Sequence, residues 1–203
     1  FQSTTWGESH TGATITTPND DRYPSAAFCW KGGNDSIYVA VERRISTSEY
    51  EIRVITTPEV PANNQYVYYI TSATSGTKYE KPCITAVNQS STVPRKILVT
   101  CTRDSVVKRA VYHYTNNGGS SWSANLALGP TTQNIDFTWC NSDSNSVAGG
   151  YLIASFVDTD GDSVTVRRGV LGTMGTFLYK RNGVLSTGTF TPVCEIYQTG
   201  GNK

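Results

Sequence analysis

The chain has 203 residues and a near-neutral charge balance, with 17 Lys plus Arg against 16 Asp plus Glu and a formal net charge of +1. This balance gives no reason to expect nucleic acid or an anionic membrane as a partner. Charged residues make up only 16% of the chain, below the ~25% of an average globular domain, and that composition is typical of a secreted β protein.

Short runs of β-branched and aromatic residues, bounded by turn residues, predict strands along the whole chain. One strand is expected over 6–17, followed by three groups of four. The groups are 27–30, 36–41, 50–57 and 65–71; then 82–85, 96–101, 108–114 and 122–128; then 137–140, 150–157, 163–170 and 176–180. A last strand is expected over 192–196. No helical periodicity is evident, and no apolar run approaches the ~20 residues of a membrane span.

A cysteine in the first strand of each group marks a repeat. Cys29, Cys83, Cys140 and Cys194 are separated by 54, 57 and 54 residues. Four antiparallel strands in every ~55 residues predict the blade of a β-propeller. We therefore expect an all-β fold across 1–203, with blades at about 22–76, 77–133 and 134–188 and part-blades at 1–21 and 189–203. A two-sheet sandwich is the main alternative, but it would not predict this recurrence.

Three blades and two part-blades cannot close a ring, because propellers typically need ~4–8 blades. We expect the remaining blades to come from a further segment of polypeptide, and the alternative is a second copy of the chain. The chain opens at Phe1 without a methionine, which favours a processed polypeptide or part of a longer one.

The turn that follows the third strand of the second group carries the most specific motif. Residues 115–122 read Thr-Asn-Asn-Gly-Gly-Ser-Ser-Trp. Asn and Gly tolerate the positive φ of a tight reversal, and short hydroxyl and amide side chains can bond backbone groups inside the turn. The motif resembles the Asp-box of sialidase-type (BNR) repeats, with Asn in place of the usual Asp. Its defining positions are Thr115, Asn117, Gly119, Ser121 and Trp122.

The resemblance implies more about fold than about catalysis. In that family the Asp-box lies between the third and fourth strands of a blade, on the outer rim away from the active site. Arg22-Tyr23-Pro24 also resembles the Arg-Ile-Pro core of a sialidase motif, whose arginine grips the substrate carboxylate as a guanidinium fork can. Asp21 stands where that family has an aromatic residue, and this carboxylate is a neighbour with which Arg22 could pair.

Two functional classes follow from the resemblance. The preferred hypothesis is a secreted or cell-surface module without catalytic activity, which binds a glycan or a protein or serves as structural material. The alternative is a fragment of a sialidase-type glycoside hydrolase, with Arg22 as the candidate catalytic-site residue. The first is preferred because the tyrosine nucleophile with its glutamate partner and the acid aspartate of such an enzyme are not identifiable in the sequence.

The cysteines leave two interpretations open. Cys83 and Cys101 lie on consecutive predicted strands at positions that would face each other, which predicts a cross-strand disulfide; two free, buried thiols are the alternative. The cysteines at 29, 140 and 194 are expected to pack in the core rather than to form bonds.

Three carboxylates alternate along a predicted loop, at Asp158, Asp160 and Asp162. Hard oxygen ligands at this spacing suit Ca²⁺, although the glutamate that completes an EF-hand loop is missing. A solvated hairpin turn built on Asp160-Gly161 is the favoured interpretation. We therefore expect no cofactor, and Ca²⁺ is the one candidate.

Overall fold

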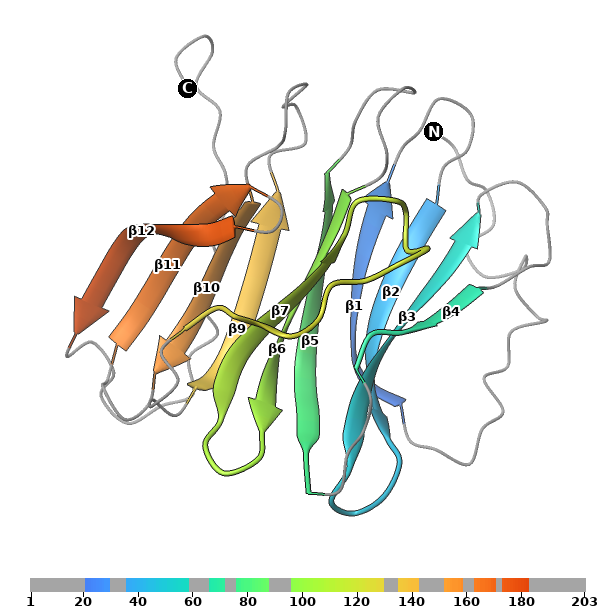
Figure 1. The fold of residues 1–203 in the computed structure, drawn as a ribbon, viewed down its shortest axis with the longest axis horizontal. Coiled ribbons are helices and arrows are strands. Elements are labelled where there is room, and N and C mark those ends of the chain that lie inside the picture. Colours follow the sequence, from blue (N-terminus) through green and yellow to red (C-terminus); the bar gives the residue numbers. More distant parts are fainter. Residues whose placement is uncertain are drawn as a thin grey trace, which may run out of the picture.

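The computed structural model describes residues 21–29, 36–58, 66–71, 76–87, 96–129, 135–142, 152–158, 163–170 and 173–182. These residues form twelve β-strands, and no helix occurs among them (Figure 1). The expectation of an all-β fold is therefore confirmed for the described part of the molecule. The strands predicted over 6–17 and 192–196 lie outside the described residues.

The strands form three antiparallel meanders, in which each strand pairs with the next one along the chain. The first meander consists of β1 (Asp21–Cys29), β2 (Ser36–Arg44), β3 (Tyr50–Pro58) and β4 (Tyr66–Tyr69). The second consists of β5 (Lys78–Val87), β6 (Lys96–Asp104), β7 (Arg109–Thr115) and β8 (Leu126–Ala127). The third consists of β9 (Ile135–Ser142), β10 (Leu152–Asp158), β11 (Ser163–Val170) and β12 (Thr173–Asn182). In Figure 1 they follow one another from right to left.

The three meanders make up two hydrogen-bonded sheets. A single parallel pair, Tyr50 with Lys78, connects β3 to β5, so that the first and second meanders share one eight-stranded sheet. The third meander is a separate four-stranded sheet. The described strands do not close into a barrel or a ring.

The outer strand of the second meander is shorter than predicted, since β8 covers two residues of the expected 122–128. The residues just before β8 pair with β7 through a side-chain hydrogen bond in addition to a backbone one. The backbone N–H of Ser123 donates to the Tyr114 carbonyl at 2.9 Å, while the Tyr114 N–H donates to Ser123 Oγ at 3.0 Å. A serine hydroxyl thus replaces a backbone acceptor, which is how serine competes with regular strand pairing.

Two apolar cores lie between neighbouring meanders, and β6 contributes to both. Ile97, Val99 and Cys101 pack in the core shared with the first meander. Leu98, which lies between them in sequence, packs in the core shared with the third. Side chains alternate between the two faces of a strand, so a strand that is buried on both sides is apolar at nearly every position. This explains why Ile97, Leu98 and Val99 are apolar at consecutive positions.

The first strands of the three meanders, β1, β5 and β9, lie next to one another, and we call them the inner strands. β1 and β5 carry the same irregularity. β1 has a bulge between Arg22 and Ser25, and β5 has one between Glu80 and Cys83. In each bulge a residue with positive φ precedes a proline: Tyr23 at 50° and Lys81 at 51°. A proline fits at a bulge because the ladder needs no N–H there. The repeated bulge fixes which residue of each inner strand faces its neighbour.

The inner strands also meet through a repeated hydrogen bond, which we call the seam contact. Between β1 and β5, the Ile84 N–H donates to Ser25 Oγ at 3.1 Å. Between β5 and β9, the Cys140 N–H donates to Cys83 Sγ at 3.4 Å. Ser25 and Cys83 are each the first paired residue after their bulge, so both seams use the same strand position.

Candidate functional site

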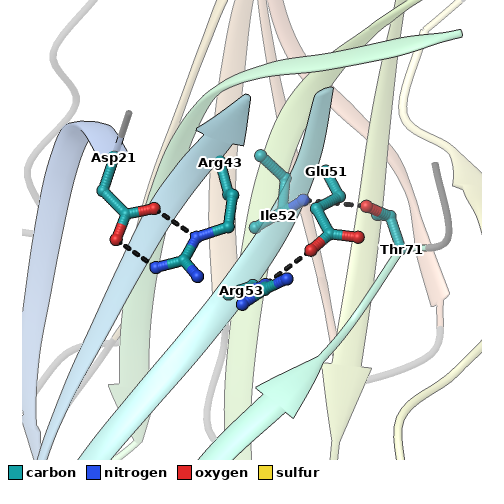
Figure 2. Close-up of polar contacts among 6 residues, drawn as sticks. All are labelled: Asp21, Arg43, Glu51, Ile52, Arg53 and Thr71. Atoms are coloured by element: carbon teal, nitrogen blue, oxygen red, sulfur yellow. Dashed lines mark hydrogen bonds and ion pairs between the residues drawn. The ribbon is translucent and has the colours of Figure 1, made fainter. Parts of the chain in front are cut away.

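Charged side chains gather at the end of the first two meanders where β1, β3 and β5 begin. The register aligns Asp21 with Arg43 and Arg43 with Glu51, so these side chains share one face of the first meander. Arg43 donates two hydrogen bonds to the Asp21 carboxylate, and Arg53 donates to Glu51 (Figure 2). Arg43 is only 3% exposed, and a buried guanidinium of this kind requires such a bidentate partner.

The Asp21 carboxylate therefore pairs with Arg43, a partner that the sequence did not indicate. The two residues stand in register on β1 and β2, and residues paired in this way point to the same face of a sheet. Arg22 is exposed and stands in register with Glu42 on β2. The positive charge of Arg22 is close enough to act on the Glu42 carboxyl.

Glu42 is a buried carboxyl that faces the second meander, with 2% of its surface exposed. Its Oε2 accepts a hydrogen bond of 3.0 Å from the Lys81 N–H in the bulge of β5. Burial raises the pKa of Glu42, and the negative charge of Glu80 adds to this; the bond from Lys81 and the charges of Arg22 and Lys81 oppose it. A buried carboxyl beside an exposed guanidinium is an arrangement found at binding and catalytic sites.

A hollow of about 440 Å³ runs along the innermost strands, within the size range of small-molecule sites. Its wall is formed by one short stretch from each meander, namely 25–28 of β1, 83–86 of β5 and 139–141 of β9. Most of the lining side chains are small, and Phe28 and Trp139 add aromatic rings. Phe28 is 47% exposed, so its ring is accessible to a ligand. The hollow combines aromatic surface with hydroxyl, thiol and amide groups, the mixture that a sugar or a peptide side chain requires.

The turn over residues 115–122 is held together by side-chain hydrogen bonds. The Gly119 N–H donates to Thr115 Oγ1 at 3.1 Å, and the Ser121 N–H donates to Asn117 Oδ1 at 3.0 Å. The amide nitrogen of Asn117 donates to Ser121 Oγ at 2.8 Å. A carboxylate at position 117 has no donor, so the Ser121 hydroxyl would have to donate to it instead. Gly118 and Gly119 have φ of 74° and 104°, a region where glycine is unstrained.

The same turn is fastened to the first meander. The hydroxyl of Tyr38 on β2 donates to the Gly118 carbonyl at 3.2 Å. The ring of Tyr68 on β4 lies 6.5 Å from that of Trp122, centroid to centroid, and the two planes are inclined by 53°. Trp122 is partly buried against the core between the two meanders. These contacts give the turn a structural role in the packing of neighbouring meanders.

The structure does not contain the Cys83–Cys101 disulfide considered from the sequence, and both residues are free thiols. The hairpin pairs Val87 with Lys96 and continues without interruption to Cys83, which aligns with Thr100 and not with Cys101. Cys101 is fully buried, and burial raises the pKa of its thiol. Cys140 is also free and buried, in agreement with the expectation that it packs in the core. The side chain of Cys29 and the whole of Cys194 lie outside the described part.

The candidate calcium loop falls largely outside the described residues. Asp158 ends β10, where its backbone aligns with Ser163 of β11, and Asp160 and Asp162 belong to the residues not described. Among the described residues, no three His, Cys, Asp or Glu side chains are grouped so that they could hold a metal ion. Within the same residues, no helix has the length and apolarity needed to cross a membrane.

Glu42, Arg43 and the Cys83–Cys140 contact were missed by the reasoning from sequence. The run Glu42-Arg43-Arg44 at the end of a strong strand was the available signal for the first two, because charges there must be either exposed or paired. Comparison of the chain with protein-family models, with curated proteins and with solved structures gave no match.

Proposed function

We propose that the three meanders are blades of an Asp-box β-propeller, and that the chain acts as a secreted or cell-surface module that binds a glycan or a protein. The remaining blades come from a further segment of polypeptide or from a second copy. The observation that carries the proposal is the hollow formed jointly by the inner strands of all three meanders. A propeller collects its inner strands around one axis, so a shared hollow of this kind is what the proposal requires.

Two further features support the proposal. The seam contact recurs between β1 and β5 and between β5 and β9, as expected if successive meanders are related by one repeated rotation. The turn over 115–122 of the second meander packs on Tyr38 and Tyr68 of the first, as expected if the motif serves packing between blades and the hollow is left for the ligand.

The alternative is a glycoside hydrolase of sialidase type, and one observation favours it. Arg22 is exposed beside the buried Glu42, so a guanidinium and a raised-pKa carboxyl lie together at the strand ends. Binding without turnover remains the proposal, because Asp21 stands where that family has an aromatic residue and its carboxylate is engaged by Arg43.

Binding is tested with an array of immobilised neutral and sialylated oligosaccharides. Phe28→Ala should weaken binding at least about tenfold, the loss expected when an accessible stacking ring is removed. The matched control is Ile37→Ala on the neighbouring strand, since Ile37 is 45% exposed but does not line the hollow. Binding that is equally strong in the Phe28→Ala variant would show that the hollow is not the site.

Hydrolysis of a fluorogenic sialoside separates the two hypotheses. The complete protein should give no turnover. Turnover by the complete protein that is lost in an Arg22→Ala variant with an unchanged melting temperature would favour the glycoside hydrolase over the binding module.

A further inference from the structure

The seam between β5 and β9 brings two cysteines into contact, although they are 57 residues apart in sequence. The Cys140 N–H donates to Cys83 Sγ at 3.4 Å, and the Cys140 thiol donates to the Cys83 carbonyl at 3.2 Å. The Cys83 thiol also lies 3.6 Å from the Cys140 carbonyl, as a donor to it. Each sulfur thus lies against the backbone of the other cysteine, which is the proximity that a disulfide between adjacent strands needs.

The fold does not itself require sulfur at these positions. In the equivalent contact between β1 and β5, Ser25 stands at the position of Cys83 and Ile84 at the position of Cys140. A hydroxyl and an aliphatic side chain therefore complete the first seam. The second seam has the same backbone arrangement with a thiol on both sides.

The two thiols differ in accessibility and in acidity. Cys83 is partly exposed and lines the open hollow, whereas Cys140 is 3% exposed. The hydrogen bond from Cys140 lowers the pKa of Cys83 to about 7, while burial raises the pKa of Cys140. Since the thiolate is the nucleophile, Cys83 is the residue that reacts first with a reagent in the hollow.

We propose that Cys83 and Cys140 form a reversible dithiol–disulfide site that ties β5 to β9 and is oxidised by a low-molecular-weight disulfide. The Cys83 thiolate attacks one sulfur of the small disulfide RS–SR, which forms Cys83–S–SR and releases RS⁻. The Cys140 thiolate then attacks Cys83 Sγ, which forms the Cys83–Cys140 bond and releases a second RS⁻. The protons of the two cysteines pass to the released thiolates, so one dithiol is oxidised and one RS–SR is reduced to two RSH.

The bond would connect the second meander to the third independently of any ligand in the hollow. It would also close a loop of 57 residues, and long loops of this kind are the ones whose closure most restricts the unfolded chain. The oxidised protein should therefore melt roughly 5–15 °C above the reduced protein.

The test treats the folded 203-residue chain with oxidised glutathione, blocks the remaining thiols with iodoacetamide and maps the linked peptides by mass spectrometry. The expected result is a peptide pair joined through Cys83 and Cys140, which dithiothreitol separates. Cys101→Ala, the control for a buried thiol outside the seam, should keep the link. Cys83→Ser and Cys140→Ser should each lose it.

A second measurement uses the double variant Cys83→Ser/Cys140→Ile, which copies the residue pair of the first seam. Its melting temperature should not respond to oxidised glutathione, whereas that of the wild type should rise. The proposal is overturned if Cys83 retains glutathione as a mixed disulfide, if it links to any other cysteine, or if the double variant keeps the redox response of the wild type.

Discussion

Gly119 shows most directly how one residue couples the turn over 115–122 to the neighbouring meander. A Cβ atom at this position would lie 2.7 Å from Cε2 of the Tyr68 ring, and the backbone has a φ of 104°. Both the contact and the conformation exclude a side chain, because the ring is held between the turn and Trp122. The glycine of the motif therefore serves the packing between meanders as well as the turn.

We expect Gly119→Ala to reduce the free energy of unfolding by about 2–4 kcal/mol, from backbone strain plus the clash with Tyr68. Gly76→Ala is the matched control, since Gly76 has a φ of 76° but a Cβ atom added there would meet nothing within 4 Å. It should lose only the strain component, about 1 kcal/mol. Urea unfolding of both variants gives the comparison, and equal losses would remove the role assigned to Tyr68.

Glu42 makes the stability of the molecule depend on pH in an uncommon direction. Its pKa in the folded protein is raised by burial, so the folded state holds the proton more tightly than the unfolded state. This contribution to stability is present at low pH and is lost as the pH rises above 4.5 through the raised pKa. Most carboxylates that form ion pairs have a lowered pKa, so they stabilise the protein at neutral pH and lose this contribution as the pH falls.

Glu42→Gln keeps an acceptor for the Lys81 N–H but cannot ionise. The variant should therefore gain stability relative to the wild type as the pH is raised to neutrality, and the two should converge at acid pH. Thermal melts across this range measure the difference. Glu51→Gln is the contrast, because it removes the negative charge that pairs with Arg53 and should destabilise the protein at neutral pH. A difference in melting temperature between Glu42→Gln and the wild type that is the same at every pH would contradict the raised pKa of Glu42.

At the scale of elements, β6 occupies a special position in the described structure. It pairs with β5 on one edge and β7 on the other, and its side chains fill the cores on both of its faces. A strand enclosed on all four sides opens only when the surrounding structure opens with it. By contrast, β4 and β8 each pair along one edge only.

Native-state hydrogen exchange should therefore find the amides of β6 among the slowest of the described strands. The amides of β4 and β8 should exchange at least about a hundredfold faster, since local fraying exposes them without global unfolding. Exchange in β6 that is as fast as in β8 would show that the two cores do not open cooperatively.

The inner strands show where prediction from sequence ends. Runs of β-branched and aromatic residues located β11 at its predicted residues 163–170, but β1 and β5 begin earlier than predicted. The register of β5 with β6 was not predictable from the sequence, because it depends on which residues pair next to the turn. The structure pairs Val87 with Lys96, which is one residue away from the register that would align Cys83 with Cys101.

At the scale of the whole molecule, the missing information was the contact between meanders. The Ser25–Ile84 and Cys83–Cys140 contacts join residues 59 and 57 positions apart, and no local pattern indicates which of them meet. The charged end of the sheet was partly predictable, since Arg22 was identified from its motif. Its relation to Glu42 required the register of β1 with β2.

The small side chains of the hollow have a consequence for the curvature of the molecule. Near β1 and β5, the first two meanders approach through small side chains such as Ser25, Ala27 and Ala86, whereas Tyr68 and Trp122 lie between the outer parts of the same two meanders. The layer of side chains between these two meanders is therefore thinner near the inner strands than near the outer ones. The taper of this layer sets the angle at which the second meander packs on the first. The volumes of a few alanine, serine and aromatic side chains thus determine how strongly the molecule curves from one meander to the next.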